Sequence, residues 1–407
     1  MTRLLEHRSL GLLEAAGIAV APSHAVDTPQ AAEVAARALG GPVVVKALVP
    51  AGGRQKGGGV AKVETPAAAA AAAEKLLGTT LGHFPVTQVL VQACVDIREE
   101  YFCALTFDSA TRSPAILFSA QGGVDIEDLV RERPDALITR PVAPAAELEP
   151  FVGREVADAA GLSGQRLLDV AEMLTRLYRV FRANDAFLLE VNPLAVDASG
   201  QLVAPSAVVV VDEQADFRHP EWEQLLDAAG SNGWRPLTAL ERAMREIDAT
   251  DAGSAIRFNE FENGAIACMM TGGGSGLVTF DHLRRLGETP ATTFDITPGR
   301  VEEKMYLATK AILSRSGLRG LVAGGNISNF IPIDVKVRGV VRALTELNVD
   351  ARRFPVVFRY AGPGVESARE ISAQIPGIEF LDERASLEEA VERIVTRIRE
   401  SGAPLRV

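Results

Sequence analysis

The sequence predicts a chain of two domains, an α+β domain followed by an α/β domain with a parallel sheet. At 407 residues the chain is longer than a single domain with one hydrophobic core usually is. Its first part mixes runs that suit antiparallel strand pairs with flanking helices, whereas its second part alternates strand, loop and helix. Because parallel strands joined by helices are covered on both faces, the second pattern predicts an open sheet between two helical layers. We expect the domains to occupy residues 1–237 and 238–407.

The mixture of hairpins and helices in the first domain suits an arrangement in two lobes. A glycine-rich stretch at 50–63 follows its first strand. The expected elements, in order, are an N-terminal amphipathic helix, strand 43–48, helix 66–77, strands 87–93, 100–108 and 115–120, helix 164–182, and strands 188–196 and 207–211.

The second domain repeats a strand, a short loop and a helix. Its expected strands are 265–270, 292–296, 320–324 and 354–360, and its expected helices include 301–316 and 333–347. Two further helices, separated by the apolar run IEFL, end the chain. The run 248–264 is expected to connect the two domains.

Composition and charge narrow the function classes. The 42 basic and 53 acidic residues give a net charge of −11, and no Lys/Arg-rich run indicates a nucleic-acid partner. No apolar stretch is long enough to span a membrane, and the charged N-terminal helix is not a secretory signal. Three cysteines, Cys94, Cys103 and Cys268, form no CxxC pair and no metal-like spacing with the five histidines. We therefore expect a reduced, cytoplasmic protein.

A glycine-rich basic loop is the first candidate binding site. Lys46 ends a strand, and Gly53, Arg54 and Lys56 follow in the stretch PAGGRQKGGGVAKV. Glycines let backbone N–H groups turn toward a ligand, and the cations would neutralise a di- or triphosphate, so we expect Lys46 and Arg54 to be accessible to solvent. The stretch lacks the GxxxxGK[ST] pattern of a Walker loop. A mobile surface loop with incidental cations is the alternative.

The segment VVVKALVPAGGRQKGGGV resembles the ATP-grasp segment of succinyl-CoA synthetase β subunits. QACVDIREEYF, SAQGGVDIE and LLEVNPL follow in the order found in that family, and the resemblance extends over essentially the whole chain. It implies an N-terminal ATP-grasp domain followed by a flavodoxin-like CoA-ligase domain. It also implies that Lys46 and Arg54, with Gly53 and Lys56 in the same loop, bind the nucleotide phosphates, and that Glu100 lies near the hinge that reads adenine and ribose.

Glu190 and Asn192 are two residues apart on an expected strand and therefore project from the same face. Two oxygen ligands suit Mg²⁺, although a polar strand edge before a proline turn would look the same. The resemblance implies that Asn192 is linked to magnesium and that Glu190 meets a phosphohistidine of a partner subunit. Ser206 stands where the family has a second magnesium carboxylate. Asp212 or another acid then replaces that carboxylate, or the nucleotide phosphates hold most of the magnesium, or catalysis is impaired.

Two glycine-rich turns in the second domain, TGGGSG (271–276) and GGNISNF (324–330), each join a strand to a helix. Such helix starts attract carboxylates and phosphates, although the glycines also suit simple tight turns. GGNISNFIPIDVKVRGVVRAL is similar to the citrate-binding loop and helix of ATP-citrate lyase. Ile331 and Tyr360 replace a hydroxyl residue and an arginine of that enzyme, which predicts a mono- or dicarboxylate instead of citrate. The expected substrate-binding residues are Gly273, Gly274, Gly325, Asn326, Ser328, Asn329 and Arg359.

The resemblance implies an ADP-forming carboxylate–CoA ligase that uses ATP, Mg²⁺ and CoA. The family's catalytic histidine and CoA-binding domain have no counterpart here, so an α-type partner subunit must supply both, and the chain alone should be inactive. A citryl-CoA synthetase or ATP-citrate lyase subunit is an alternative within this class. A catalytically degenerate subunit that binds and stabilises its partner is an alternative of another class. The second sheet argues against a freestanding ligase that joins a carboxylate to an amine. The sequence leaves open which acid is activated and whether ATP or GTP is used.

Overall fold

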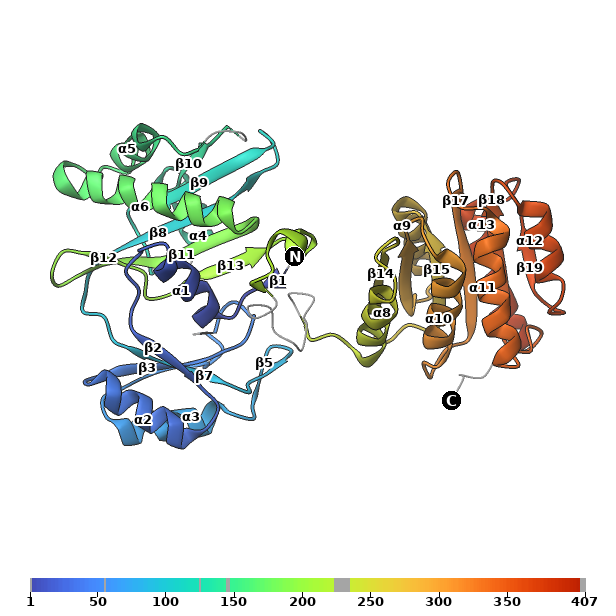
Figure 1. Cartoon of the computed structure of the whole chain (residues 1–407), viewed down its shortest axis with the longest axis horizontal. Helices are drawn as coiled ribbons and strands as arrows, with labels where there is room; N and C mark the ends of the chain where they lie inside the picture. The colour runs from blue at the N-terminus through green and yellow to red at the C-terminus, as the bar shows by residue number, and fades with distance from the viewer. Residues whose placement is uncertain (1, 55, 124–125, 144–146, 223–234, 403–407) are drawn as a thin grey trace. The chain divides into compact units, whose positions relative to one another are not determined.

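The computed structural model describes residues 2–54, 56–123, 126–143, 147–222 and 235–402. The chain divides into an N-terminal unit, Met1–Pro236, and a C-terminal unit, Leu237–Val407 (Figure 1). None of the helices in these ranges combines the length and the apolar character that crossing a membrane requires.

The N-terminal unit contains a small four-stranded antiparallel sheet with two alanine-rich helices against it (Figure 1). Both helices start at a Thr-Pro pair, in which the hydroxyl of Thr28 or Thr65 accepts a hydrogen bond from a backbone N–H of the first turn. The sheet runs in the order β2 (Ser23–Val26), β7 (Val89–Ala93), β3 (Val43–Ala47) and β4 (Val60–Val63), and the helices are α2 (Pro29–Leu39) and α3 (Pro66–Leu76). The short strands β5 (Thr80–Leu81) and β6 (Phe84–Pro85) form a separate pair.

A larger antiparallel sheet forms the second lobe of this unit. Its order is β1 (Thr2–Arg3), β13 (Val208–Val211), β11 (Ala186–Asp197), β8 (Ile97–Asp108), β9 (Ser113–Ser119) and β10 (Ile138–Pro141), with β12 (Leu202–Val203) paired to β11. Its helical segments are α1 (Glu6–Ala15), α4 (Ile126–Glu132), η1 (Pro134–Ala136), α5 (Pro150–Ala159), α6 (Gly164–Ala183) and η2 (Glu213–Arg218). Helices α1 and α6 bury their apolar faces against the sheet, and the hydroxyl of Ser9 fixes α1 by accepting a 3.2 Å hydrogen bond from the Val209 N–H.

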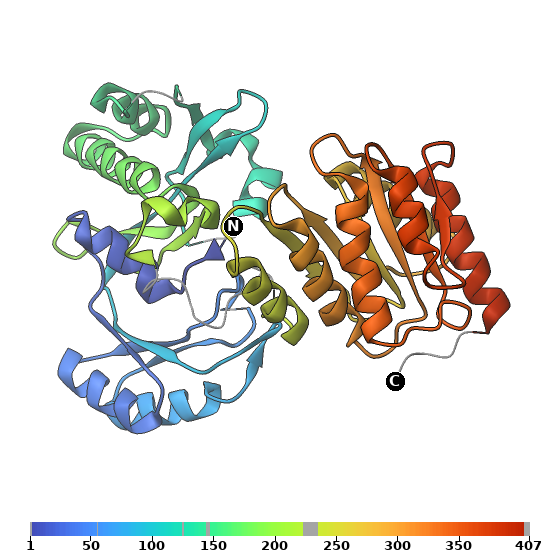
Figure 2. The ribbon, with the colours of Figure 1, turned by 45° about the vertical axis from the view of Figure 1, so that its right-hand side comes forward.

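The C-terminal unit is built around a four-stranded parallel sheet with helices on both faces (Figure 2). The sheet order is β15 (Ile266–Thr271), β17 (Gly320–Ile327), β18 (Val356–Ala361) and β19 (Glu379–Leu381). The helices are α8 (Ala239–Ala249), α9 (Gly273–Arg285), α10 (Val301–Leu313), α11 (Ile333–Glu346), α12 (Val365–Ser372) and α13 (Leu387–Ser401). Strands β14 (Ile256–Glu260) and β16 (Thr292–Ile296) form a separate antiparallel pair.

Alternation along the parallel strands explains the two helical layers. On β15, Ala267 and Met269 belong to the core shared with α10 and α11, whereas Cys268 and Met270 belong to the core shared with α9 and α13. The expected fold class is therefore confirmed. Two details of the expectation are wrong: the run 248–264 lies within the C-terminal unit as the end of α8 and strand β14, and the strand at 292–296 pairs with β14 and not within the parallel sheet.

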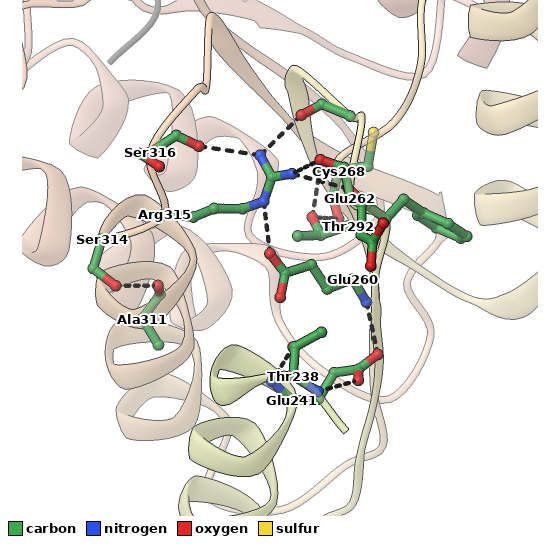
Figure 3. Close-up of polar contacts among 12 residues, drawn as sticks. Thr238, Glu241, Glu260, Glu262, Cys268, Thr292, Ala311, Ser314, Arg315 and Ser316 are labelled. Atoms are coloured by element: carbon green, nitrogen blue, oxygen red, sulfur yellow. Dashed lines mark hydrogen bonds and ion pairs between the residues drawn. The ribbon is translucent and has the colours of Figure 1, made fainter. Parts of the chain in front are cut away.

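Arg315, just after α10, fixes the turn between β14 and β15 (Figure 3). Its Nε donates to the Glu260 carboxylate at 2.7 Å, and its two terminal nitrogens donate to the carbonyl oxygens of Phe261, Glu262 and Gly264 at 2.8–2.9 Å. The planar guanidinium satisfies a carboxylate and three turn carbonyls at once, which an ammonium on a flexible stem does not reproduce. This contact holds the start of β15 in place below the glycine-rich turn at its other end.

Candidate functional site

The two cations expected to bind phosphates converge on one buried carboxylate. Glu6, in the first turn of α1, lies 2.8 Å from Lys46 Nζ and 2.5 Å from Arg54 Nη2, and 2% of its side chain is exposed. Lys46 reaches it because alternation on β3 directs Val45 and Ala47 toward α2 and α3, so that Lys46 points away from them. Lys46 also donates to the Pro205 carbonyl at 3.0 Å. The expectation that both cations are accessible is wrong, since their side chains are 11% and 13% exposed.

Burial and the neighbouring charges shift the pKa of Glu6 in opposite directions. Burial alone would raise the pKa of Glu6, but Lys46 and then Arg54 outweigh it, so that the pKa lies below its ordinary value and the carboxyl is ionised at neutral pH. Arg3 belongs to the same group: its pKa is lowered by burial and by Arg54, and raised by Glu190 and Glu6. Three cations and two carboxylates therefore share this part of the N-terminal unit.

The backbone of the glycine-rich loop needs glycine at defined positions. The N–H of Gly59 donates to the Arg54 carbonyl at 2.8 Å, and a Cβ at Gly57 or Gly59 would lie 3.1 Å from the Leu81 side chain. Gly53 has a φ of 65°, which glycine adopts without strain, and open space surrounds its α-carbon. Lys56 is exposed. The loop thus turns back on itself around Arg54 and leaves the Gly53 side open.

Glu190 lies on the central strand β11, between Ala104 of β8 and Val208 of β13. Burial raises the pKa of its carboxyl, and the positive charge of Arg3 partly opposes that rise. Arg3 pairs with Val210, two residues along β13 from Val208, so Arg3 and Glu190 project from the same face of the sheet. This shared face explains why the charge of Arg3 acts on Glu190.

A glycine connects the candidate hinge carboxylate to the candidate magnesium residue. The N–H of Gly123 donates to Asn192 Oδ1 at 2.9 Å, and a Cβ on Gly123 would lie 1.9 Å from Glu100 Oε2. Gly123 also has a φ of 68°, so only glycine fits here without strain. Residues 124 and 125 of the SAQGGVDIE motif lie outside the described residues. Glu100 and Asn192, 92 positions apart in the chain, therefore meet at one turn.

The residues around Asn192 fit magnesium only through neutral oxygens and Glu190. The register that pairs Glu190 with Val208, and Ala195 with Val203, sets Ser206 opposite Asn192. The alternative that Asp212 supplies the missing carboxylate is wrong: Asp212 follows the other end of β13, and its side chain caps η2 by accepting the Gln214 N–H. In the ranges that the structure describes, no three His, Cys, Asp or Glu side chains gather as a metal site. Asn192, Ser206 and Glu190 offer few charged oxygens, which suits Mg²⁺ that is held largely by substrate phosphates.

The expected substrate residues of the C-terminal unit gather where β15 and β17 end. Gly273 and Gly274 start helix α9 and are exposed, with open space around their α-carbons. Gly325 is buried, and a Cβ there would lie 2.3 Å from the Thr271 carbonyl. Asn326 is exposed near the end of β17, and Asn329 is exposed in the turn that follows. The carboxyl end of a parallel sheet, next to helix N-termini, is the usual position of a ligand site.

Two residues on β18 have different roles. Arg359 is buried, and it donates to the carbonyls of Gly325 at 2.8 Å and Ala385 at 3.0 Å, so it supports the turn from within the sheet. Tyr360 points to the opposite face, where it is 1% exposed and packs against Phe358 and Phe380. Its hydroxyl has no hydrogen-bond partner among the described residues. Ile331 is also buried in that core.

Sequence reasoning missed three charged residues of these sites: Arg3, Glu6 and Lys336. Arg3 and Glu6 fell within the run expected as an N-terminal amphipathic helix, and Lys336 fell within the expected helix 333–347, with no role assigned to any of them. Glu6 is in fact 3% exposed and Lys336 is 4% exposed. A charge on the buried stripe of a helix is the signal that could have found Glu6 and Lys336, because such charges are rare unless a partner balances them.

Family models match both units of the chain. The family model of the ATP-grasp domain matches residues 3–196, and that of the ATP citrate lyase citrate-binding region matches residues 235–377. The ADP-forming succinate–CoA ligase β subunit of Chloroflexus aurantiacus is 34% identical over 91% of this chain and 93% of its own length. The GDP-forming β subunit of Thermus thermophilus is 35% identical over 90% of this chain and 92% of its own length.

Among solved structures, ATP citrate lyase from Methanothrix soehngenii in complex with citrate and coenzyme A shares the fold, with a TM-score of 0.76 and 19% identity. The match covers 97% of this chain and 100% of that chain. The two sequence relatives are similar along nearly their whole length, and the two family models together span both units. The chain belongs to the family of succinate–CoA ligase β subunits.

Proposed function

We propose that the protein is the nucleotide-binding subunit of an ADP-forming carboxylate–CoA ligase, which converts ATP, a carboxylate and CoA to an acyl-CoA, ADP and phosphate. The observation that carries this proposal is the similarity to succinate–CoA ligase β subunits along more than nine-tenths of the chain. The ATP-grasp family model, which matches residues 3–196, includes the segment in which Lys46 and Arg54 meet at Glu6. The acid, and the choice between ATP and GTP, stay open, since the relatives include ADP-forming and GDP-forming ligases.

In this proposal the N-terminal unit orients and neutralises the nucleotide. Lys46 and Arg54 would exchange part of their contact with Glu6 for phosphate oxygens, and the open backbone at Gly53 would approach the same oxygens. Glu100 would lie at the nucleoside end. Asn192 and Ser206 would face Mg²⁺, which neutralises the transferred phosphoryl group when bound. Glu190, with its raised pKa, would lie where the phosphoryl group leaves.

An α-type partner would supply the CoA-binding domain and the histidine that carries the phosphoryl group. Large apolar side chains beside the glycine-rich turns of the C-terminal unit support a docking surface there: Leu277 is 68% exposed, Ile327 is 66% exposed and Phe330 is 86% exposed. Activity should therefore require both subunits. Turnover by the isolated chain would contradict this part of the proposal.

A citrate-activating enzyme is the second candidate, because the citrate-binding family model matches residues 235–377. Tyr360, which replaces an arginine of ATP-citrate lyase, is buried in the core and provides no cation. This substitution favours a mono- or dicarboxylate. Citrate-dependent ADP release by the complete complex would instead favour the second candidate.

Replacing Lys46 or Arg54 by methionine should weaken Mg·ATP binding by roughly 10–100-fold, since each change removes a charge-assisted contact worth about 1.5–3 kcal/mol. Calorimetric titration well below the melting temperature measures this effect. Both changes also disturb the Glu6 ion pairs, so folding should be verified by circular dichroism. Lys62→Met is the matched control, because Lys62 is exposed on the neighbouring strand β4. Unchanged affinity in both variants would refute the nucleotide assignment.

Ser206→Asp should tighten magnesium-dependent ATP binding severalfold, because it provides a charged oxygen opposite Asn192. The measurement is a titration of ATP affinity against Mg²⁺ concentration in the wild type and the variant. Ser199→Asp is the control, since Ser199 lies on the exposed turn of the same hairpin. No improvement would mean that Ser206 does not face the metal.

A further inference from the structure

Lys336 is a buried lysine at the carboxyl end of the parallel sheet of the C-terminal unit. It lies in the first turns of α11, and it is 4% exposed. Its ammonium donates to Thr271 Oγ1 at 3.1 Å and to Ser328 Oγ at 3.2 Å. Thr271 is the last residue of β15, and Ser328 follows the last residue of β17. The charge therefore lies between the two glycine-rich turns.

The partners of this ammonium leave its charge unbalanced. The Thr271 hydroxyl donates a hydrogen bond to the Gly324 carbonyl, and the Ser328 hydroxyl donates one to the Ile331 carbonyl. Toward Lys336, both hydroxyls therefore act only as neutral acceptors. An ammonium has three N–H donors, and the third has no acceptor among the described residues. No carboxylate in the described ranges lies within 4.0 Å of Lys336 Nζ. The Asp295 carboxylate acts on it from farther away, while its Oδ1 accepts the backbone N–H groups of Gly272 and Ile296.

A buried cation without a counter-ion is costly unless a ligand provides one. Burial lowers the pKa of Lys336, and Asp295 only partly opposes this shift, as expected for a charge that lacks a close partner. Lys304 is the contrasting case in the same unit, since its buried ammonium has four oxygen acceptors, including the Asp248 carboxylate at 2.9 Å. The exposed backbone of Gly273 and Gly274, at the start of α9, adds the positive end of a helix beside Thr271.

We propose that Lys336 is the charged anchor of the carboxylate substrate, to which it donates its third N–H, with the N-terminus of α9 at the same carboxyl end of the sheet. This role rests on the proposed ligase function and makes Lys336 a residue that determines substrate specificity. A single ammonium balances one carboxylate. Tyr360 is buried and provides no cation. The Arg359 guanidinium, the other buried cation beside these turns, donates to the Gly325 and Ala385 carbonyls from within the sheet, which favours a small mono- or dicarboxylic acid over a tricarboxylic acid.

The test compares Lys336→Met with the wild-type full chain and with Lys310→Met, a partly exposed lysine paired with Glu346 on the same unit. Thermal unfolding is followed with acetate, succinate, citrate or inorganic phosphate, with sodium chloride to match ionic strength. We expect acetate or succinate to raise the melting temperature of the wild type and of Lys310→Met. Lys336→Met should lose this shift, with an apparent affinity at least about tenfold weaker.

Without ligand, Lys336→Met should melt at the same temperature as the wild type or higher, because the change removes an unbalanced buried charge. A clearly lower melting temperature would identify Lys336 as a structural lysine and overturn the proposal. So would a wild type that responds to none of the carboxylates, or to phosphate alone. ATP binding is measured on the same samples: its absence from the wild type would refute the proposed function while leaving the carboxylate result to stand, and its retention in Lys336→Met separates the two sites.

Discussion

Replacing Lys304 by methionine should lower the free energy of unfolding of the C-terminal unit by about 3–5 kcal/mol, the usual loss when one partner of a buried charge pair is removed. Only 2% of its side chain is exposed. The ammonium donates to the carbonyl oxygens of Asp248, Asp251 and Ser254 at 2.7–2.8 Å and to the Asp248 carboxylate at 2.9 Å. Methionine fills similar space but leaves these oxygens without a donor.

Scanning calorimetry on the full chain would measure this loss, and hydrogen exchange at β15 and β17 would assign it to the C-terminal unit. Because the chain has two units, unfolding need not be a single transition, so the assignment by region matters. Lys310→Met is the control, since its surface pair with Glu346 is screened by solvent and should contribute little to stability. Equal losses in both variants would mean that the four contacts of Lys304 contribute little to stability.

Replacing Glu6 by glutamine should destabilise the N-terminal unit by an amount in the same range, about 3–5 kcal/mol near neutral pH, because it leaves Lys46 and Arg54 without their shared counter-charge. The effect should depend on pH. Burial favours the neutral carboxyl, but Lys46 and Arg54 together lower the pKa of Glu6 below its ordinary value of 4.5. The contribution of Glu6 is therefore complete above pH 4.5 and is lost as the pH falls through the lowered pKa of the folded state.

Denaturant unfolding at pH 7 and at several acidic values tests this sign. The wild type should lose more stability than Glu6→Gln on acidification, so that the two curves converge. Glu14→Gln, an exposed position on the same helix, should follow the wild type at every pH. A difference between wild type and Glu6→Gln that stays constant down to strongly acidic pH would show that Glu6 is not the coupled group.

The fold was largely predictable because its signals are local. Continuous runs of apolar residues predicted the buried parallel strands. The two glycine-rich turns predicted where β15 and β17 end and the next helices begin. The position of β16 was not predictable, because a strand–loop–helix pattern does not say which neighbour a strand pairs with. The register of β13 was equally hidden, and it decides that Ser206, and not Asp212, lies opposite Asn192.

The sequence predicted the cations of the nucleotide site but not the carboxylate that pairs with them. Lys46 and Arg54 stand in a motif, but their counter-ion Glu6 lies 40 positions before Lys46, in a helix whose pattern resembles any amphipathic surface helix. Lys336 sits among alternating polar and apolar residues in the same way. The helical spacing places these two charges on a buried stripe, but tertiary contacts, which no local pattern records, decide which partners they meet.

The bond from Lys46 to Glu6 and Pro205 has a kinetic consequence. Lys46 comes from the small sheet, whereas Glu6 and Pro205 come from helix α1 and the segment before β13, so this one ammonium braces two lobes against each other. If Lys46 receives a phosphate, the brace has to be released first. Nucleotide association should then be gated by an opening step, slower than a simple encounter and saturating at high nucleotide concentration. The net charge of −11 gives an anionic nucleotide no long-range attraction that would speed the encounter.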